Sequence, residues 1–243
     1  MKLLLCTLLA LALPAAAQDY EREKRWAAEV VPNLVVGDAV RLKLPGGRDF
    51  LGIYTASKPA RGAVLLLHGM GVHPDHGVIG ALRVSLADAG YATLSIQMPV
   101  LKADARAEDY LPALFPESLW RIRAGGRWLE EHGYLKNFLL CHSMGCRMAN
   151  AYYEETADAP FAAWVVLGVT SPFGRLGNVK VPVFDVFGDM DFPAVLRDDW
   201  RRRLALNGIP GSEQRVIPGA DHYYTGRESE LAAVVRDFLA RVP

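Results

Sequence analysis

The segment Cys141-His142-Ser143-Met144-Gly145 has a pattern in which a serine can act as a nucleophile. It follows the apolar run 138–140 and precedes a helical pattern, so a buried strand should turn sharply into a helix at Ser143. Such a corner exposes the serine above the sheet and requires small residues on both sides of it. Gly145 meets this requirement, whereas Cys141 stands where glycine is more usual. The context predicts a nucleophile elbow at Ser143. An ordinary serine at a turn is the alternative.

A serine hydroxyl becomes a strong nucleophile only when a neighbouring imidazole takes its proton. His222 follows the last expected strand, 214–217, and precedes a closing helical pattern. A histidine in that loop can reach the edge of the sheet at which Ser143 is expected. We therefore predict His222 as the general base, against the alternative of a surface histidine beside Asp221.

The imidazole in turn needs a carboxylate that fixes its tautomer and stabilises its charged form. Gly188-Asp189-Met190-Asp191 follows the apolar run 181–187 and offers two acids. Asp191 lies three residues beyond the turn glycine, far enough to bend toward His222, so we predict it as the acid. Asp189 is expected to hydrogen-bond the loop backbone. The chain order serine, acid, histidine is that of α/β-hydrolases.

Backbone amides near the serine could bind the negative charge that develops on a substrate carbonyl oxygen. His68-Gly69-Met70-Gly71 follows the apolar run 63–67, and its glycines let the backbone turn toward the elbow. We expect the amides of Met70 and Met144 to form this oxyanion hole. A plain glycine-containing turn is the alternative.

Loops on the same edge carry other residues of possible function. His73-Pro74-Asp75-His76, with His68 nearby, could suggest a metal site, but a proline-containing loop does not guarantee that three ligands converge, so we expect neither metal nor cofactor. Loop aromatic residues could line an apolar pocket or simply pack locally; the candidates are Phe115, Phe173, Phe192, Tyr223 and Tyr224.

The elements that would hold these residues alternate between short apolar runs and helical patterns. Strands are expected at 63–67, 91–96, 138–140, 161–169, 181–187 and 214–217, and helices at 78–89, 117–132, 146–155, 198–206 and 230–241. An antiparallel hairpin, 35–44 and 50–54, should add to one edge. This order predicts a single doubly wound, mostly parallel sheet. Only Thr170 to Lys180 separate two of the strands, so no large lid is expected over the site.

The first 17 residues are typical of a signal peptide. Lys2 precedes an apolar run that is too short to span a bilayer, and Ala15-Ala16-Ala17 offers a cleavage site. We therefore predict a signal peptide at 1–17, a hydrolase domain at 18–243, and export to the periplasm or beyond. Export makes a disulfide between Cys141 and Cys146 chemically possible. Two buried reduced thiols are nevertheless the preferred interpretation, because a bridge demands a specific Cα separation.

Composition limits the class of partner. Lys and Arg total 27 and Asp and Glu total 27, so the net charge gives no reason to expect nucleic acid or an anionic membrane. A small ester-like molecule fits better, and no stable membrane insertion is expected once the signal peptide is removed. The sequence does not determine an oligomeric state.

The chain resembles the α/β-hydrolase superfamily over nearly all of its length after residue 17. More narrowly, Leu65 to Asp75 and Tyr91 to Ser95 resemble an exported bacterial family whose function is unknown. The resemblance implies a triad of Ser143, Asp191 and His222 and export to the periplasm. We expect a serine hydrolase that acts on a carboxylic ester or thioester through an acyl-enzyme. A non-catalytic binding protein of the cell envelope, or a peptidase that uses the same triad, are the alternatives.

Overall fold

The computed structural model describes residues 18–243. The predicted signal peptide, residues 1–17, lies outside the described residues and stays a prediction. The strands of the described part are β1 (Asp38–Lys43), β2 (Asp49–Thr55), β3 (Ala63–Leu67), β4 (Ala92–Ile96), β5 (Asn137–His142), β6 (Ala163–Leu167), β7 (Val183–Met190) and β8 (Glu213–Asp221). Its α-helices are α1 (Tyr20–Val30), α2 (Gly77–Asp88), α3 (Ala107–Glu131), α4 (Met144–Glu155), α5 (Pro193–Arg197), α6 (Asp199–Leu206) and α7 (Glu228–Arg241).

All of these strands join one sheet in the order β1-β2-β4-β3-β5-β6-β7-β8. β1 pairs antiparallel with β2, and β2 pairs antiparallel with β4, whereas the remaining neighbours are parallel. The predicted doubly wound, mostly parallel sheet with an antiparallel hairpin at one edge is therefore confirmed. The consequence for function is that the carboxyl ends of β3, β5, β7 and β8 lie along the same edge.

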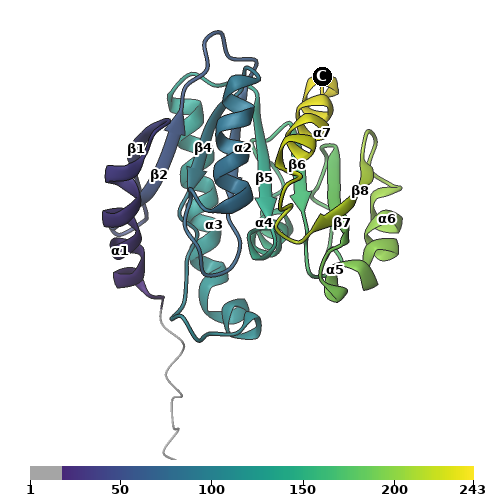
Figure 1. Ribbon diagram of the computed structural model, residues 1–243, viewed down its shortest axis with the longest axis horizontal. Coiled ribbons are helices and arrows are strands. Elements are labelled where there is room, and N and C mark those ends of the chain that lie inside the picture. The colour runs from purple at the N-terminus through teal and green to yellow at the C-terminus, as the bar shows by residue number, and fades with distance from the viewer. Residues whose placement is uncertain (1–17) are drawn as a thin grey trace, which may run out of the picture.

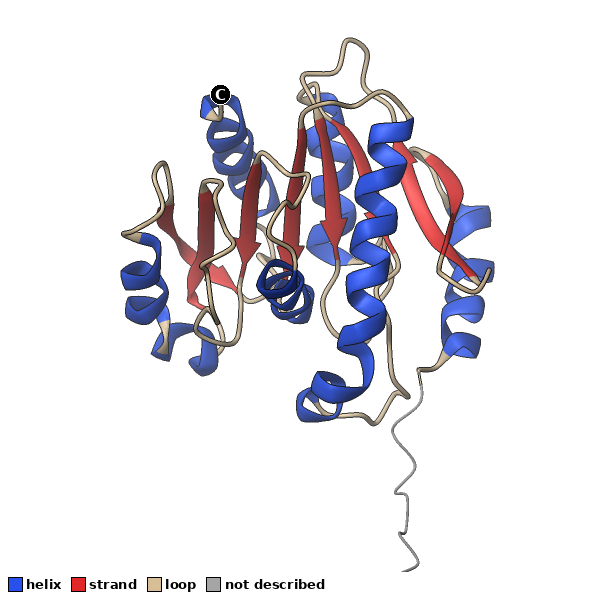
Figure 2. Cartoon of the chain, turned by 180° about the vertical axis from the view of Figure 1, so that it is seen from behind, coloured by secondary structure: helices blue, strands red, loops and turns tan. Residues whose placement is uncertain are grey.

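Helices cover both faces of the sheet, because its central strands are buried on both sides. β3, β4, β5 and β6 are buried at every position, so each face needs its own apolar partner. α2 and α7 pack on the face that is nearer in Figure 1, and α3 and α4 pack on the opposite face, seen in Figure 2. The two apolar cores on either side of the sheet hold the strand ends in register.

The helix α3 begins ten residues earlier than the pattern predicted. The expected start at residue 117 follows Pro116, since proline normally interrupts a helix. In the structure the helix runs from Ala107, and Tyr110 and Leu114 on its first turns are buried in the core. Tertiary burial of these two side chains outweighs the local cost of proline. The helix α1, which the sequence analysis did not predict, packs Ala27 and Val30 against β2.

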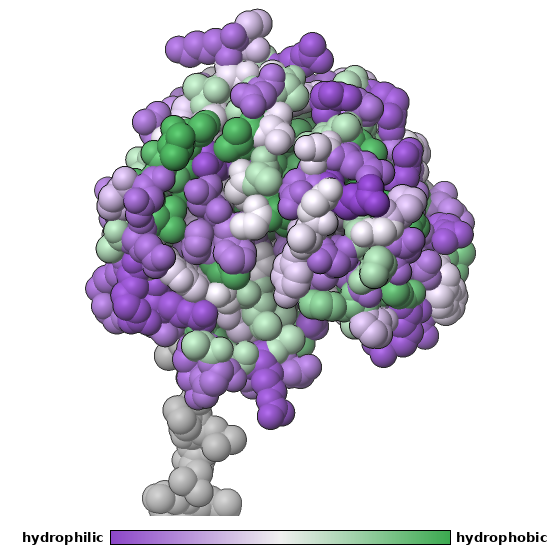
Figure 3. All heavy atoms as spheres, viewed as in Figure 1, coloured by the Kyte–Doolittle hydropathy of each residue, from purple (hydrophilic) through white to green (hydrophobic). Residues whose placement is uncertain are grey.

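Between β6 and β7, residues 168–182 form no helix or strand, so no lid domain is inserted there. Within residues 18–243 no helix has the length and apolar character needed to cross a membrane. The face seen in Figure 3 is largely hydrophilic and is interrupted by separate apolar areas. The site is therefore held by a sheet with two covered faces and is not roofed by a separate domain.

Candidate active site

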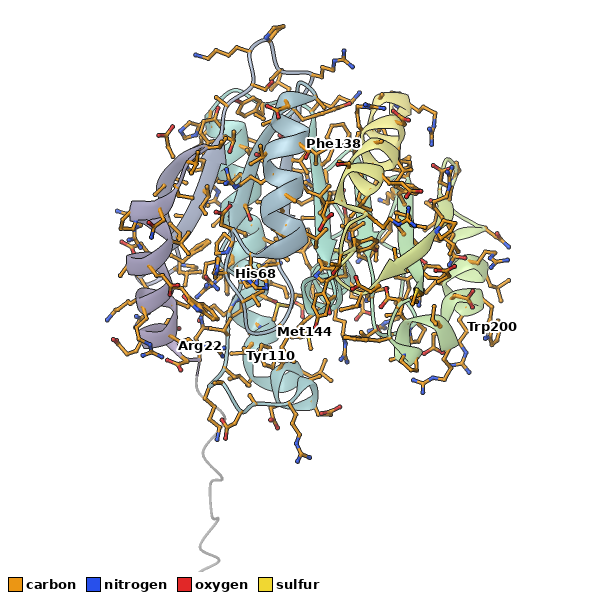
Figure 4. All side chains as sticks on the ribbon, in the orientation of Figure 1. Arg22, His68, Tyr110, Phe138, Met144 and Trp200 are labelled. Carbon is orange, nitrogen blue, oxygen red and sulfur yellow. A yellow bond between two sulfur atoms is a disulfide. The ribbon has the colours of Figure 1, made fainter. Side chains whose placement is uncertain are left out.

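Four polar side chains of interest each directly follow the last residue of a parallel strand. His68 follows β3, Ser143 follows β5, Asp191 follows β7 and His222 follows β8. Because parallel strands end at the same edge of the sheet, this placement gathers residues that are up to 154 positions apart in the chain. In Figure 4 the labelled His68 and Met144 lie at this edge, whereas Phe138, near the start of β5, lies at the other.

Ser143 occupies a strained backbone corner between β5 and α4. Its φ is 54° and its ψ is −118°, a conformation that few residues other than glycine adopt. The amide of Ser143 donates to the carbonyl oxygen of Leu167 at 2.9 Å, which ties the corner to the neighbouring strand β6. Because the helix α4 begins at Met144, the positive end of its dipole lies next to the serine. The local structure is the predicted elbow.

The imidazole of His222 lies between the serine and a carboxylate. Its Nε2 is 3.0 Å from Oγ of Ser143, and its Nδ1 is 2.6 Å from Oδ1 of Asp191. A carboxylate can only accept, so Nδ1 carries the proton and Nε2 is left to accept from the serine hydroxyl. His222 and Asp191 are 3% and 4% exposed, which shields this chain of hydrogen bonds from water. The structure thus brings together all three residues of the predicted triad.

The two competing acids have different partners. Asp191 Oδ1 also accepts from the amide of Phe192 at 2.7 Å, which orients the carboxylate toward His222. Asp189 is exposed, and its Oδ1 accepts from the amide of Gly219 at 2.6 Å. Gly188 and Asp189 lie within β7 and Gly219 lies within β8, so Asp189 bonds the backbone of the neighbouring strand and not, as expected, that of a loop. Asp185, within β7, is buried and pairs with Arg202 at 2.8 Å.

Two neighbours that sequence reasoning did not single out for this purpose hold His222 in place. The Nε2–H of His142 donates to the carbonyl oxygen of His222 at 2.9 Å. Burial, followed by the nearby His222 ring, lowers the pKa of His142 to about 4, so this ring stays neutral near pH 7. The ring of Phe192 stacks on the imidazole of His222 with centroids 4.1 Å apart. Together with the hydrogen bond from its Nδ1 to Asp191, these two contacts fix the orientation of His222.

The predicted oxyanion donors flank the serine. Met144 N lies at the start of α4, and Met70 lies in a turn after β3. This turn is close to the elbow, since a β-carbon built on Gly69 would be 3.3 Å from the β-carbon of Ser143. Among the described residues, neither amide donates a hydrogen bond to another protein group. Both are therefore free to bind a ligand oxygen.

His68 holds the first peptide of this turn. Its Nε2 accepts from the amide of Met98 at 2.9 Å, so Nδ1 carries the proton and donates to the carbonyl oxygen of Gly69 at 2.8 Å. Burial lowers the pKa of His68 to about 3, which keeps this tautomer neutral. In a trans peptide the N–H points opposite to the C=O. Fixing the Gly69 carbonyl therefore also fixes the direction of the Met70 amide.

The two cysteines form a disulfide, so the preferred interpretation of two reduced thiols was wrong. Cys141 is the penultimate residue of β5, on one side of Ser143, and Cys146 lies in the first turn of α4 on the other. Their Cα atoms are 4.9 Å apart, a separation that a disulfide can span. The strand-to-helix turn brings the two side chains to this distance, which spacing along the sequence could not reveal. Trp164 Nε1–H donates to Cys141 Sγ at 3.2 Å.

A cavity of about 130 Å³ opens beside Ser143. Apolar side chains, including Val72, Val78 and Ile79, line much of it, and no Asp, Glu, Lys or Arg is among its lining residues. Two of the predicted pocket aromatics, Phe192 and Tyr223, line this cavity and are 43% and 54% exposed. The site is therefore a largely apolar pocket that has Ser143 in its wall.

The other aromatic candidates pack elsewhere. Phe115 lies within α3 and Phe173 packs against Trp164, with ring centroids 5.5 Å apart, and both join the core on the α3 side of the sheet. Tyr224 is fully buried and donates its hydroxyl to the carbonyl oxygen of Val186 at 2.8 Å. For these three the alternative of local packing holds, because Tyr224 is buried in one apolar core and the half-buried Phe115 and Phe173 pack against the other.

The His73-Pro74-Asp75-His76 loop has local structural contacts, and its last residue, His76, also lines the cavity beside Ser143. Asp75 pairs with the buried Arg83 at 2.6 Å, and His73 lies against His76 with ring centroids 5.4 Å apart. Within residues 18–243, no cluster of three or more His, Cys, Asp or Glu side chains is arranged to hold a metal ion.

Comparison with known proteins identifies the fold. The family described as "Protein of unknown function (DUF3530)" matches residues 3–118. Similar solved structures include a dienelactone hydrolase from Anabaena variabilis, with 21% identity, a TM-score of 0.66, and coverage of 85% of this chain and 97% of that one. No curated protein matches the sequence significantly.

Two further solved structures are similar to this chain, and one of them is described as having no lid. An esterase from Pyrococcus furiosus has 17% identity and a TM-score of 0.64, over 85% of this chain and 92% of that one. An α/β serine hydrolase without a lid, from Xanthomonas campestris, has 14% identity and a TM-score of 0.62, over 86% and 95%. The chain has the α/β-hydrolase fold, without a large lid domain.

Proposed function

We propose that this protein is a serine hydrolase that cleaves a carboxylic ester or thioester through an acyl-enzyme on Ser143. The observation that carries the proposal is the position of His222, whose two ring nitrogens lie 3.0 Å from Ser143 Oγ and 2.6 Å from Asp191 Oδ1. A hydroxyl, an imidazole and a buried carboxylate in this order are the groups that acyl transfer requires.

In the proposed reaction, Ser143 Oγ attacks the carbonyl carbon while its proton passes to Nε2 of His222. Asp191 stabilises the imidazolium that forms and stays ionised throughout. The tetrahedral intermediate then collapses, and Nε2 returns the proton to the departing alcohol or thiol. Water repeats the sequence on the acyl-enzyme, which releases the carboxylic acid and restores Ser143.

The developing oxyanion is proposed to accept from the amides of Met70 and Met144. Each such donor lowers the barrier by about 3 kcal/mol in related enzymes. Both amides are fixed before the substrate arrives, the first through the Gly69 carbonyl and the second by the start of α4. Preorganised donors of this kind need no rearrangement as charge develops.

The pocket favours a small and neutral acyl group. Its volume of about 130 Å³ and the lack of charged side chains in its lining disfavour long chains and anionic acyl groups. The rings of Phe192 and Tyr223 are available to contact the apolar part of an ester at the mouth. We therefore expect acetyl to butyryl esters to react faster than long-chain esters.

The proposed location is outside the cytoplasm, in the periplasm or beyond. The signal-peptide pattern of residues 1–17 supports this, and a disulfide at Cys141 and Cys146 fits an oxidising compartment.

The proposal is tested with the mature chain, meaning residues 18–243 that removal of the predicted signal peptide would leave. A fluorophosphonate probe and p-nitrophenyl esters are the reagents. We expect one covalent adduct on Ser143 and hydrolysis of p-nitrophenyl acetate. Ser143→Ala should lose the adduct and at least roughly 10⁴-fold in rate. Ser57→Ala, in the loop between β2 and β3 at the opposite edge of the sheet, is the matched control and should behave as the wild type.

Two results would argue for the alternatives. A folded protein that neither reacts with the probe nor hydrolyses any ester of the series would contradict the proposal and favour a non-catalytic binding protein. Faster turnover of peptide amides than of esters would favour a peptidase.

A further inference from the structure

Helix α1 reaches the candidate oxyanion site through one side chain. The Nη2 of Arg22 donates to the carbonyl oxygen of Gly71 at 3.0 Å, and its Nη1 donates to that of Leu101 at 2.8 Å. These acceptors lie 49 and 79 residues further along the chain. The labelled Arg22 in Figure 4 lies at the same edge of the sheet as His68 and Met144. A single guanidinium thus joins α1 to two loops at the site.

The helix gives Arg22 a firm support that does not depend on these bonds. Ala27 and Val30 pack against Leu51 and Ile53 of β2. Before the helix, the amide of Asp19 donates to the carbonyl oxygen of Val100 at 2.8 Å. Loss of the Arg22 side chain should therefore leave α1 in place.

The carbonyl that Arg22 holds belongs to the turn that carries the Met70 amide. Gly71 has a φ of +69°, a conformation that glycine adopts without strain. On the other side of Met70, the carbonyl of Gly69 accepts from His68 at 2.8 Å. The Gly69–Met70 peptide and the Gly71–Val72 peptide are thus each fixed by a donated hydrogen bond, one from inside the fold and one from α1.

We propose that Arg22 is a positioning residue for the oxyanion site, which it stabilises through the carbonyl of Gly71. This inference rests on the proposed function, since it assigns the Met70 amide to the oxyanion. The planar guanidinium suits the task because it donates in two fixed directions at once. Without it, the turn keeps the His68 contact but gains freedom at Gly71, and the Met70 amide loses part of its preorganisation.

The test compares Arg22→Gln, Arg22→Lys and Arg25→Gln in the mature chain with p-nitrophenyl acetate. Arg25 is exposed on the same helix, so its variant is the matched control. We expect Arg22→Gln to lower kcat roughly 10- to 100-fold, with little change in KM, because small misplacements of catalytic groups cost this much. Arg22→Lys, which keeps one donor direction, should recover part of the rate, and Arg25→Gln should match the wild type.

Hydrogen exchange at residues 69–72 gives a readout that does not require turnover. Faster exchange there in Arg22→Gln than in Arg25→Gln, at unchanged melting temperature, would support the tether, that is, the stabilisation of this turn by the hydrogen bond from Arg22 to the Gly71 carbonyl. A folded Arg22→Gln protein with wild-type kcat, or with unchanged exchange in this turn, would overturn it. If the wild type fails to react with the fluorophosphonate, the proposed function fails, and the catalytic role of Arg22 fails with it. Exchange would still decide whether the tether exists.

Discussion

Gly145 lies so close to His68 that a β-carbon at position 145 would be 2.5 Å from the carbonyl oxygen of His68. The end of β3 and the first turn of α4 thus meet backbone to backbone, directly beside Ser143. This contact keeps the serine corner and the turn that carries the Met70 amide at a constant separation. It also explains why the elbow needs glycine two residues after the serine.

Gly145→Ala should therefore separate the two elements and affect both stability and activity. Overpacking of this kind costs about 1–3 kcal/mol of unfolding free energy, and the shift of Ser143 should lower kcat. Urea unfolding and ester hydrolysis measure the two effects. Gly177→Ala is the control, because a β-carbon there meets nothing within 4 Å. Equal behaviour of the two variants would show that the backbone yields without cost.

Replacing Asp189 and Asp191 one at a time should distinguish their roles. Asp191→Asn removes the acceptor for Nδ1–H of His222 and should lower kcat roughly 10³- to 10⁴-fold while leaving the fold intact. Asp189→Asn alters only the contact to the amide of Gly219 and should keep nearly wild-type kcat. Steady-state kinetics with p-nitrophenyl acetate decide between them. A larger loss at Asp189 would assign the acid differently.

Reducing the bond between Cys141 and Cys146 should destabilise the protein. Closing so short a loop contributes about 2 kcal/mol by restricting the unfolded chain. The urea midpoint of the protein should therefore fall when a phosphine reductant is present. Mass spectrometry after alkylation in denaturant checks the premise, because both cysteines should resist iodoacetamide until they are reduced. Alkylation of both without reductant would contradict the bond.

Acid should weaken the fold through the two buried histidines His68 and His142. Burial lowers the pKa of these rings to about 3 and about 4, against 6.5 in the unfolded chain. A base with a lowered folded pKa contributes stability above pH 6.5, and this contribution is lost as the pH falls toward the folded pKa. At pH 5, each ring should lower the free energy of unfolding by on the order of 2 kcal/mol relative to pH values above 6.5. The comparison is between urea midpoints at pH 7.5 and pH 5.

Variants distinguish the contribution of His142 to this loss of stability from that of other titrating groups. His142→Asn should reduce the loss of stability between the two pH values, whereas His132→Asn, at an exposed position, should not. An identical pH dependence in both variants and the wild type would assign the acid sensitivity to other groups.

Much of the architecture followed from local patterns. The run 63–67 is apolar at every position, as a strand covered on both faces must be, and the structure has β3 there with all five residues buried. The positions of Ser143, Asp191 and His222 also followed, since each stands three to five residues beyond the end of an expected strand. Because parallel strands end at one edge, their order in the sequence was enough to expect them together; their catalytic role stays a proposal.

Contacts that depend on how the chain turns and packs could be decided only by the tertiary structure. The bond between Cys141 and Cys146 depends on how tightly the strand turns into the helix, and the early start of α3 depends on a core that buries Tyr110. Arg22 meets Gly71 because α1 packs beside the sheet edge. Periodicity reports which face of an element is apolar, but the direction of one polar side chain depends on neighbours that arrive from elsewhere in the chain.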